Sequence, residues 1–215
     1  MKALHIPFLG QNLFLHPFKS IYWEEKKTLI IADLHLGKVT HFRKAGIPVP
    51  LQAADTNWDK LYTLFLEYQP KRLLVLGDLF HSSYNSAWEE WAQFVQQFPS
   101  TRFELVLGNH DILELKNYQE AGLIVHSIAL REPPFLFTHE PSSDNSLYNL
   151  AGHIHPCVLL KGAAKQYLRL ACFYFGATAG ILPAFGAFTG MAKLDIKKGE
   201  HVYVITENEV LNVSV

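Results

Sequence analysis

The chain has 215 residues, of which 49% are hydrophobic and 18% charged, the composition of a folded globular protein. Its formal net charge of -1 excludes a strongly basic nucleic-acid coat, although not a local basic groove. No run of 18 apolar residues occurs and the first 20 residues make a poor signal peptide, so we expect a cytoplasmic protein without membrane contact. No linker separates two halves, and one domain is predicted over residues 1–215.

Short apolar runs that end in a polar residue recur along the chain. They are residues 29–32 before Asp33, 73–77 before Asp78, 105–108 before Asn109, 135–138 before His139 and 150–152 before His153. Short aliphatic runs of this kind are typical of strands that are buried on both faces. The pattern predicts five buried strands, each with a polar side chain at its carboxyl end.

Helices are predicted between the early strands. Residues 51–68 place apolar side chains at helical spacing, and residues 86–98 do the same after Ser86 and Glu89, which have the spacing of a capping box. Strands that alternate with helices predict parallel pairing in the first half of the chain.

The last third of the chain is richer in strands. Residues 173–175 and 201–206 have strand composition, and residues 209–213 follow with Asn208 in a hairpin turn. The predicted fold class is therefore α/β, with a mixed two-sheet β-sandwich core flanked by helices.

The polar strand ends predict a metal site. Ligands of open α/β sheets bind beyond the carboxyl ends of the strands, and parallel strands would bring the five ends to one edge. Residues at i and i+2 of an extended segment point the same way, which applies to Asp33 with His35 and to His153 with His155. Glycine precedes Asp78, Asn109 and His153, and it lets the backbone turn sharply. The predicted ligands are Asp33, His35, Asp78, Asn109, His139, His153 and His155.

Seven ligands exceed what one ion needs, and they fit two ions that share Asp78 as a bridge. Imidazole and carboxylate ligands without a thiolate favour Mn, Fe or Zn over Ca, and Mn is the expected metal. Any single histidine is more often a core or surface residue, and any single Gly-Asp pair is usually a turn. Five such ends in succession argue against coincidence.

The same motifs resemble a known family. Asp33-Leu34-His35, Gly77-Asp78, Gly108-Asn109-His110-Asp111, His139 and Gly152-His153-Ile154-His155 are similar, in order, to the motifs of the calcineurin-like metallophosphoesterases. A narrower resemblance to the bacterial DNA ligase-associated metallophosphoesterases rests on residues 32–38, 42–50, 76–82, 139–141, 152–156, 182–186 and 188–190.

The resemblance implies the calcineurin-like metallophosphoesterase fold, two divalent metal ions and hydrolysis of phosphodiester or phosphomonoester bonds. It implies that Asp33, His35 and His155 hold the first ion, that Asn109, His139 and His153 hold the second, and that Asp78 bridges them. It also implies that His110 faces the scissile phosphate as a general acid or charge stabiliser, oriented by Asp111.

Substrate contacts are predicted around this centre. Arg43 and Lys38 are candidate phosphate anchors, with solvent-exposed loop charges as the alternative. His81 stands where relatives often have an acidic residue, and it would orient a ligand, contact substrate or be a surface histidine. In the uncharged segment 182–190, Phe185 or Phe188 would stack a base or pack in the interior.

Three functions remain open from the sequence. The first is a nuclease or nucleotide phosphodiesterase that acts on single-stranded DNA, RNA or nucleotides, with a DNA ligase and a helicase as partners in DNA repair. This repair context follows from the narrower resemblance alone. The second is a small-molecule phosphodiesterase or phosphatase. The third is a catalytically inactive metal-binding scaffold, against which the presence of Asp78, Asn109 and His110 argues.

Overall fold

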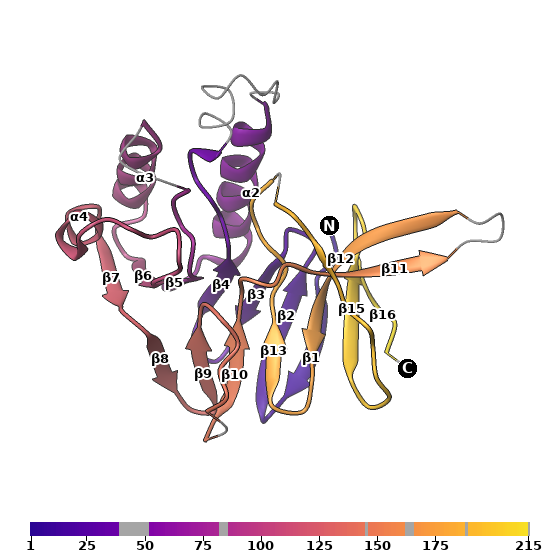
Figure 1. The fold of residues 1–215 in the computed structure, drawn as a ribbon. Helices are drawn as coiled ribbons and strands as arrows, with labels where there is room; N and C mark the ends of the chain where they lie inside the picture. Colours follow the sequence, from indigo (N-terminus) through magenta and orange to yellow (C-terminus); the bar gives the residue numbers. More distant parts are fainter. Residues whose placement is uncertain (39–51, 82–85, 145, 162–165, 188, 215) are drawn as a thin grey trace.

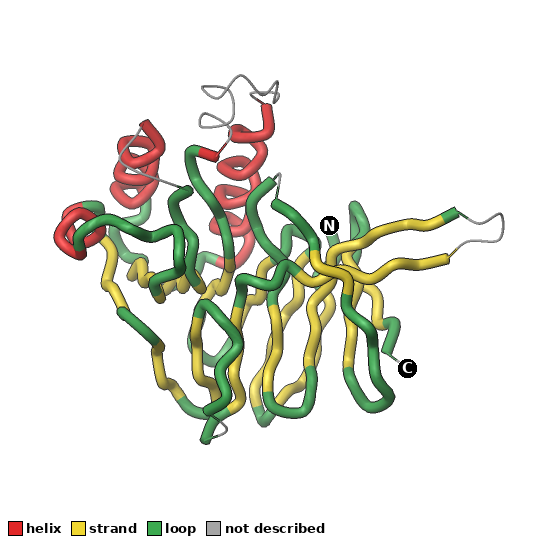
Figure 2. Tube along the Cα trace, in the orientation of Figure 1, coloured by secondary structure: helices red, strands yellow, loops and turns green. Residues whose placement is uncertain are grey.

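The structure is a computed structural model that describes residues 1–38, 52–81, 86–144, 146–161, 166–187 and 189–214. Two mixed sheets stack on each other, and helices cover the outer face of the first sheet (Figure 1). Figure 2 shows that the helices gather at one end of the molecule, whereas the C-terminal part consists of strands and loops. No helix among the described residues is long and apolar enough to cross a membrane.

The first sheet has the order β1-β2-β3-β4-β5-β6-β7. Its strands are β1 (Leu4–Phe8), β2 (Gln11–His16), β3 (Ser20–Trp23), β4 (Thr28–Ala32), β5 (Arg72–Leu76), β6 (Arg102–Val106) and β7 (Leu123–His126). β1 to β4 form an antiparallel meander, and β4 to β7 pair in parallel. The helices α2 (Gln52–Tyr68), α3 (Ser86–Gln97) and α4 (Leu115–Glu120) follow β4, β5 and β6.

The second sheet has the path β14-β11-β12-β13-β10-β9-β8, with β15 paired to β12 and β16 paired to β15. Its strands are β8 (Ala129–Glu132), β9 (Phe135–Thr138), β10 (Tyr148–Ala151), β11 (Pro156–Lys161), β12 (Tyr167–Phe175), β13 (Ala179–Ile181), β14 (Ala192–Lys193), β15 (His201–Ile205) and β16 (Val210–Asn212). β9, β10 and β13 pair in parallel, whereas β11 and β12 form a hairpin that projects from the body in Figure 1.

Two cores explain why the aliphatic runs of β4 and β5 are uninterrupted. Leu29 and Ile31 of β4 face one core, which lies between the first sheet and the helices. Ile30 and Ala32 of the same strand face the second core, which lies between the two sheets. Because successive side chains of a strand point to opposite faces, both sets must be apolar. This three-layer packing confirms the predicted mixed two-sheet core flanked by helices.

The predicted elements are confirmed with small shifts at their ends, and several strands were missed. The helices predicted at 51–68 and 86–98 correspond to α2 and α3, while the side chain of Ser86 lies outside the described residues. The turn predicted at Asn208 joins the antiparallel strands β15 and β16. The strands β1, β2, β3, β7, β8, β11, β13 and β14 were not predicted, because their runs are short or interrupted by polar residues.

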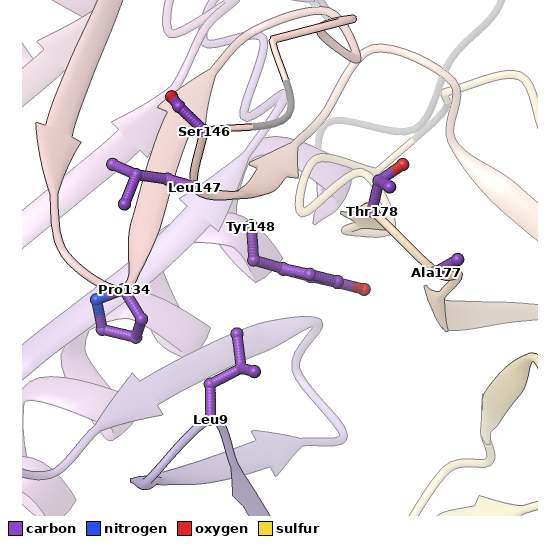
Figure 3. A pocket seen from close by; sticks show the side chains of 7 residues that line it. All are labelled: Leu9, Pro134, Ser146, Leu147, Tyr148, Ala177 and Thr178. Carbon is purple, nitrogen blue, oxygen red and sulfur yellow. The ribbon is translucent and has the colours of Figure 1, made fainter.

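A pocket of about 350 Å³ opens at the amino ends of β9, β10 and β13. Figure 3 shows Tyr148 between Leu9 of the β1–β2 turn and the segment around Thr178. The predicted polar cluster lies at the carboxyl ends of these strands instead. This pocket is therefore separate from the candidate metal centre.

The aromatic packing of α3 generates a stability prediction. Phe94 is fully buried and contacts Phe65 of α2 at 4.9 Å and Phe103 of β6 at 6.0 Å between ring centroids. Phe94→Ala removes a large buried side chain, so we expect a loss of about 3–5 kcal/mol in the free energy of unfolding. Urea denaturation measures this loss. Gln93→Ala, on the exposed face of the same helix, is the control and should change stability by less than about 0.5 kcal/mol.

Candidate metal centre

The candidate metal centre lies where the carboxyl edges of the two sheets meet. Asp33, Asp78 and Asn109 follow β4, β5 and β6 of the first sheet, whereas His139 and His153 follow β9 and β10 of the second. The five polar strand ends therefore come together, but not at the edge of one sheet as the sequence predicted. A hydrogen bond from the backbone N–H of His153 to Asp33 Oδ2 (2.9 Å) joins the two sheets directly.

Glycine is required at this edge mainly because there is no room for a side chain. A Cβ on Gly77 would lie 2.0 Å from His139 Nδ1, and one on Gly152 would lie 2.6 Å from Asp33 Oδ2. A Cβ on Gly108 would lie 2.3 Å from Asp78 Oδ1. Only Gly77 among these three also has a positive φ, of 77°. The prediction that these glycines permit sharp turns thus holds at Gly77, and close approach explains the other two.

Five of the predicted ligands adopt left-handed backbone conformations. Their φ values are 54° at Asp33, 50° at His35, 52° at Asp78, 65° at His153 and 52° at His155. Such conformations cost about 1–3 kcal/mol each in non-glycine residues, and they cluster at functional sites. The expectation that the two i, i+2 pairs lie in extended segments was wrong, because the chain turns at each of these residues.

The first group of ligand atoms comes from Asp33, His35 and His155, and one atom of each lies within 4.8 Å of the others. Asp33 is fully buried, and its Oδ1 lies 3.3 Å from His155 Nε2. Neither of these two atoms has a hydrogen-bond partner among the described residues. His155 Nδ1 lies 3.0 Å from the carbonyl oxygen of Gly190, to which it can donate. This hydrogen bond leaves the Nε2 lone pair directed at the group.

The second group surrounds His139. Its Nδ1 lies 3.1 Å from the Leu76 carbonyl oxygen, which leaves Nε2 free to accept or to ligate. Three predicted ligands surround that Nε2: Asn109 Oδ1 at 3.0 Å, His153 Nδ1 at 3.0 Å and Asp78 Oδ2 at 3.6 Å. The structure therefore brings together all four residues that were expected to share the second ion.

Asp78 lies between the two groups. Its Oδ2 is 3.7 Å from His35 Nε2 on one side and 3.6 Å from His139 Nε2 on the other. Asp33 is also near both groups, but it approaches His139 on the Nδ1 side, at 3.9 Å, and Nδ1 already faces the Leu76 carbonyl. Asp78 thus has the geometry expected of a bridging carboxylate. The assignment of individual ligands stays a prediction.

The protonation of the cluster suits a divalent cation. Burial, together with the charges of Lys38 and neighbouring histidines, lowers the pKa of His35 to about 2, so its imidazole is neutral and can ligate. Asp33 and Asp78 are buried among these imidazoles. Buried carboxylates require a compensating positive charge, and the two unpartnered atoms at Asp33 and His155 supply ligand positions. The residues present therefore fit a metal ion.

His110 lies beside the cluster. Its backbone N–H donates to Asp78 Oδ1 at 2.9 Å, and its ring centroid lies 5.3 Å from that of His35. The half-buried ring also stacks on His81, with centroids 5.3 Å apart and an angle of 25°. The structure therefore brings His81 and His110 to the candidate centre together.

Asp111 has a different role from the one expected. Its carboxylate accepts backbone hydrogen bonds from Asp78 (2.8 Å), Gly108 (2.9 Å) and Phe80 (3.3 Å). Among the described residues it makes no hydrogen bond to the ring of His110. Burial raises the pKa of Asp111 to about 7, although these hydrogen bonds oppose the shift. Asp111 therefore holds the loops that carry Asp78 and Asn109, and it does not orient the His110 ring.

Some of the residues predicted to contact substrate lie near the cluster, and others do not or lie outside the described residues. Lys38 is half-buried close to the cluster, where burial lowers its pKa while the charges of Asp78 and Asp33 oppose that shift. Arg43 and Phe188 lie outside the described residues. Segment 182–187 does lie beside the centre, because the N–H of Gly186 donates to the Asp33 carbonyl at 3.1 Å. Phe185 is fully buried in the core, so it packs in the interior and cannot stack a base.

Sequence reasoning missed the groups that orient the histidines. The carbonyl oxygens of Leu76 and Gly190 contact the Nδ1 atoms of His139 and His155. Asn149 steadies the strand end before His139 through a hydrogen bond from Nδ2 to Thr138 Oγ1 (2.8 Å). Every residue has a backbone carbonyl, so the sequence does not show which carbonyls contact a histidine. Only the structure could identify those of Leu76 and Gly190.

Comparisons with known proteins agree with this geometry. The sequence model of the calcineurin-like phosphoesterases matches residues 26–173, most of the chain, and the protein therefore belongs to this family. The crystal structure of Pseudomonas putida nuclease MPE is similar with a TM-score of 0.85 and 26% identity, covering 99% of this chain and 100% of that one. Yfce, a phosphoesterase from E. coli, has a TM-score of 0.41 at 13% identity, over 83% and 87% of the two chains. The comparison with curated proteins finds no match.

The family and the site together define the class of protein. Calcineurin-like phosphoesterases use divalent metal ions, and the two groups of ligand atoms supply places for them. The protein is a metal-dependent phosphoesterase, and hence a hydrolase.

Gly77 allows a test of the predicted second ligand group. Gly77→Ala would press a methyl group against His139 Nδ1, so we expect Mn²⁺ affinity to fall about 10–100-fold, as when a group that orients a ligand is disturbed. Isothermal titration calorimetry measures the affinity. Gly10→Ala is a matched control, because Gly10 also has a positive φ, of 74°, but open space around it. Unchanged Mn²⁺ binding in Gly77→Ala would count against His139 as a ligand.

The contacts of Asp111 predict a loss of stability on substitution. Asp111→Asn replaces one of the two acceptor oxygens with an NH2 group that cannot accept, so at least one buried N–H loses its partner. We expect the free energy of unfolding to fall by about 1–3 kcal/mol for each N–H left unpaired. Urea denaturation of the chelator-treated chain measures it, with exposed Asp195→Asn as the control.

The same substitution should change the pH dependence of stability. The pKa of Asp111 rises from 3.8 to about 7 on folding, so the folded chain binds more protons than the unfolded chain between these values. Stability from this group is therefore lost as the pH rises from about 4 to about 7. Asp111→Asn should remove that slope in the chelator-treated protein. An identical slope in the variant would show that Asp111 does not titrate there.

Proposed function

We propose that the protein is a manganese-dependent nuclease that hydrolyses phosphodiester bonds of nucleic acid. The observation that carries the proposal is a pair of adjacent ligand groups that share Asp33, with Asp78 between His35 and His139. Two-metal sites of this kind serve displacement reactions at phosphorus. The similarity over nearly the full length of both chains to a protein described as a nuclease supports nucleic acid as the substrate class.

The ligand sets follow from the two groups. Asp33, His35 and His155 would hold one ion, Asn109, His139 and His153 would hold the other, and Asp78 would contact both. Bound divalent ions supply Lewis acidity, which activates water and neutralises charge on the phosphate. Mn²⁺ suits mixed oxygen and imidazole ligands without thiolates.

His110 is the proposed proton donor to the leaving oxygen. Its backbone is anchored to Asp78 Oδ1, so the residue stays against the cluster, and its ring is half-buried and therefore open to substrate. An alkoxide is a poor leaving group that needs a proton as the bond to phosphorus breaks. His81 stacks on this ring and would hold its orientation or contact the phosphate. Lys38, close to Asp33 and Asp78, would offer positive charge to the same phosphate.

The biological setting is also a proposal. The resemblance to DNA ligase-associated metallophosphoesterases favours a cytoplasmic role in DNA repair, with a DNA ligase and a helicase as partners. Single-stranded DNA is the first substrate to test, followed by RNA and nucleotides.

Hydrolysis assays test the proposal. Purified protein with Mn²⁺ should cleave both an activated aryl phosphodiester and single-stranded DNA. Asp78→Asn should lower both rates by at least about 100-fold, because it removes the charge between the two ligand groups. His110→Ala should lower DNA cleavage by about 100–10,000-fold and aryl ester hydrolysis by less, because an aryl oxide leaves without a proton.

The controls are an aspartate and a histidine outside the cluster. Asp144→Asn and His201→Ala are both exposed and should leave both rates within about twofold of the wild type. Cleavage of the aryl ester without DNA or RNA cleavage would contradict the nuclease assignment and favour a small-molecule phosphodiesterase. Equal loss on both substrates in His110→Ala would contradict its role as proton donor.

A further inference from the structure

A second pocket, of about 360 Å³, lies at the amino ends of β5 and β6. Its lining consists entirely of charged residues: Lys26, Lys71, Arg72, Arg102 and Glu132. Arg72 and Arg102 are the first residues of β5 and β6, and Glu132 is the last residue of β8. The pocket therefore lies between strands of both sheets.

This pocket is remote from the candidate metal centre. β5 runs from Arg72 at the pocket to Leu76, and Asp78 follows at the centre. At about 3.3 Å per residue, the strand from Arg72 to Leu76 spans about 13 Å, and the metal centre lies beyond its carboxyl end. A ligand in this pocket would not contact the metal ligands.

Positive charge exceeds negative charge around the pocket. Glu132 pairs with Arg72 Nη1 at 2.7 Å and with Lys26 Nζ at 3.3 Å. The neighbouring carboxylate of Glu104 pairs with Arg102 Nε at 2.6 Å and lies 3.6 Å from Arg72 Nη1. The side chain of Lys71 has no ion pair or hydrogen bond within the described parts of the chain. Four cations thus face two carboxylates.

Glu104 is further shared with His126, whose Nε2 lies 2.7 Å from its Oε2. Burial would raise the pKa of Glu132, but the hydrogen bonds and charges of Arg72 and Lys26 hold it below its usual value. Glu132 is therefore ionised and keeps both cations at the pocket wall. The two carboxylates hold the cations in position and neutralise only part of their positive charge.

Arg72 is held rigidly in this wall. The residue is 5% exposed, and its Nε donates to Thr28 Oγ1 at 2.9 Å. Its Nη1 is held by Glu132 at 2.7 Å, so the guanidinium that lines the pocket has a fixed position. A guanidinium that carboxylates hold in place is suited to bind phosphate oxygens.

We propose that this pocket is a phosphate-binding site. The excess of positive charge suits an anionic phosphate group, and Arg72, Lys71 and Arg102 are the proposed contacts. The volume exceeds that of one phosphate ion and falls in the range of small-molecule pockets, so it leaves room for the group that carries the phosphate. If the bound phosphate belongs to a free nucleotide, that group is its nucleoside. If the phosphate belongs to a nucleic-acid strand, that group is the adjoining nucleotides.

Calorimetric titration tests the site in the full chain. The chain carries Asp78→Asn and is treated with chelator, so that metal at the candidate centre does not bind the probe. The probes are inorganic phosphate, thymidine 5′-monophosphate and a six-residue oligothymidylate without a terminal phosphate. We expect one saturable site for at least one probe, with affinity that falls between 50 and 200 mM salt as ion pairs are screened.

Two substitutions and two controls locate the site. Lys71→Gln, which breaks no ion pair among described residues, and Arg102→Ala should each weaken binding at least tenfold, with thermal denaturation checking that the variants fold. Lys198→Ala, an exposed cation in the turn before β15, should leave binding unchanged. Lys38→Ala removes a cation near the candidate metal centre, and it should also leave probe binding unchanged.

The outcomes separate the two sources. Binding of the monophosphate alone identifies a free nucleotide, and binding of the oligonucleotide alone identifies the backbone of a strand. The proposal is overturned if no probe binds, if Lys71→Gln and Arg102→Ala bind like the parent, or if Lys38→Ala instead abolishes binding.

Discussion

At their carboxyl edges, the two sheets approach so closely that a methyl group does not fit between them. A Cβ on Gly152 would lie 2.7 Å from the Cβ of Ala32 and 3.0 Å from the carbonyl oxygen of Leu76, both in the opposite sheet. This approach allows His139 to reach the Leu76 carbonyl and the N–H of His153 to reach Asp33. Every other property of the site depends on it, because neither sheet alone supplies a complete set of ligands.

Close approach also sets the electrostatics of the site. Asp33 and Asp78 are removed from water by the packing of the two sheets, and the nearest polar neighbours are imidazoles. Burial keeps His35 neutral, so its imidazole does not neutralise Asp78 as a salt-bridge partner would. The centre therefore gathers buried carboxylates and ligating atoms that fit metal ions, although the whole chain has a net charge of only -1.

The sequence was sufficient to predict which polar strand ends the fold brings together, because each of these ends follows a short aliphatic run with a local signature. It could not show which runs belong to the same sheet, since pairing partners are distant in the chain. The runs before Asp78 and His139 look alike, yet β5 and β9 lie in different sheets. The resemblance implied that Asp111 orients His110. The N–H groups that bind its oxygens belong partly to residues 78 and 80, which are distant from Asp111 in the chain. The N-terminal strands were missed because their patterns are short and the turn at Leu9 and Gly10 interrupts them.

The hydrogen bond between His153 and Asp33 also constrains the order of events during synthesis. A ribosome makes the first sheet early, and domains can begin to fold as the N-terminal part emerges. The strands β4, β5 and β6 are complete once residue 106 has been made, but His139, His153 and His155 come later. A nascent chain that ends before residue 139 therefore has Asp33, His35 and Asp78 without the three histidines that the second sheet supplies. The centre is completed only late in translation, so a chain truncated in its second half cannot form it.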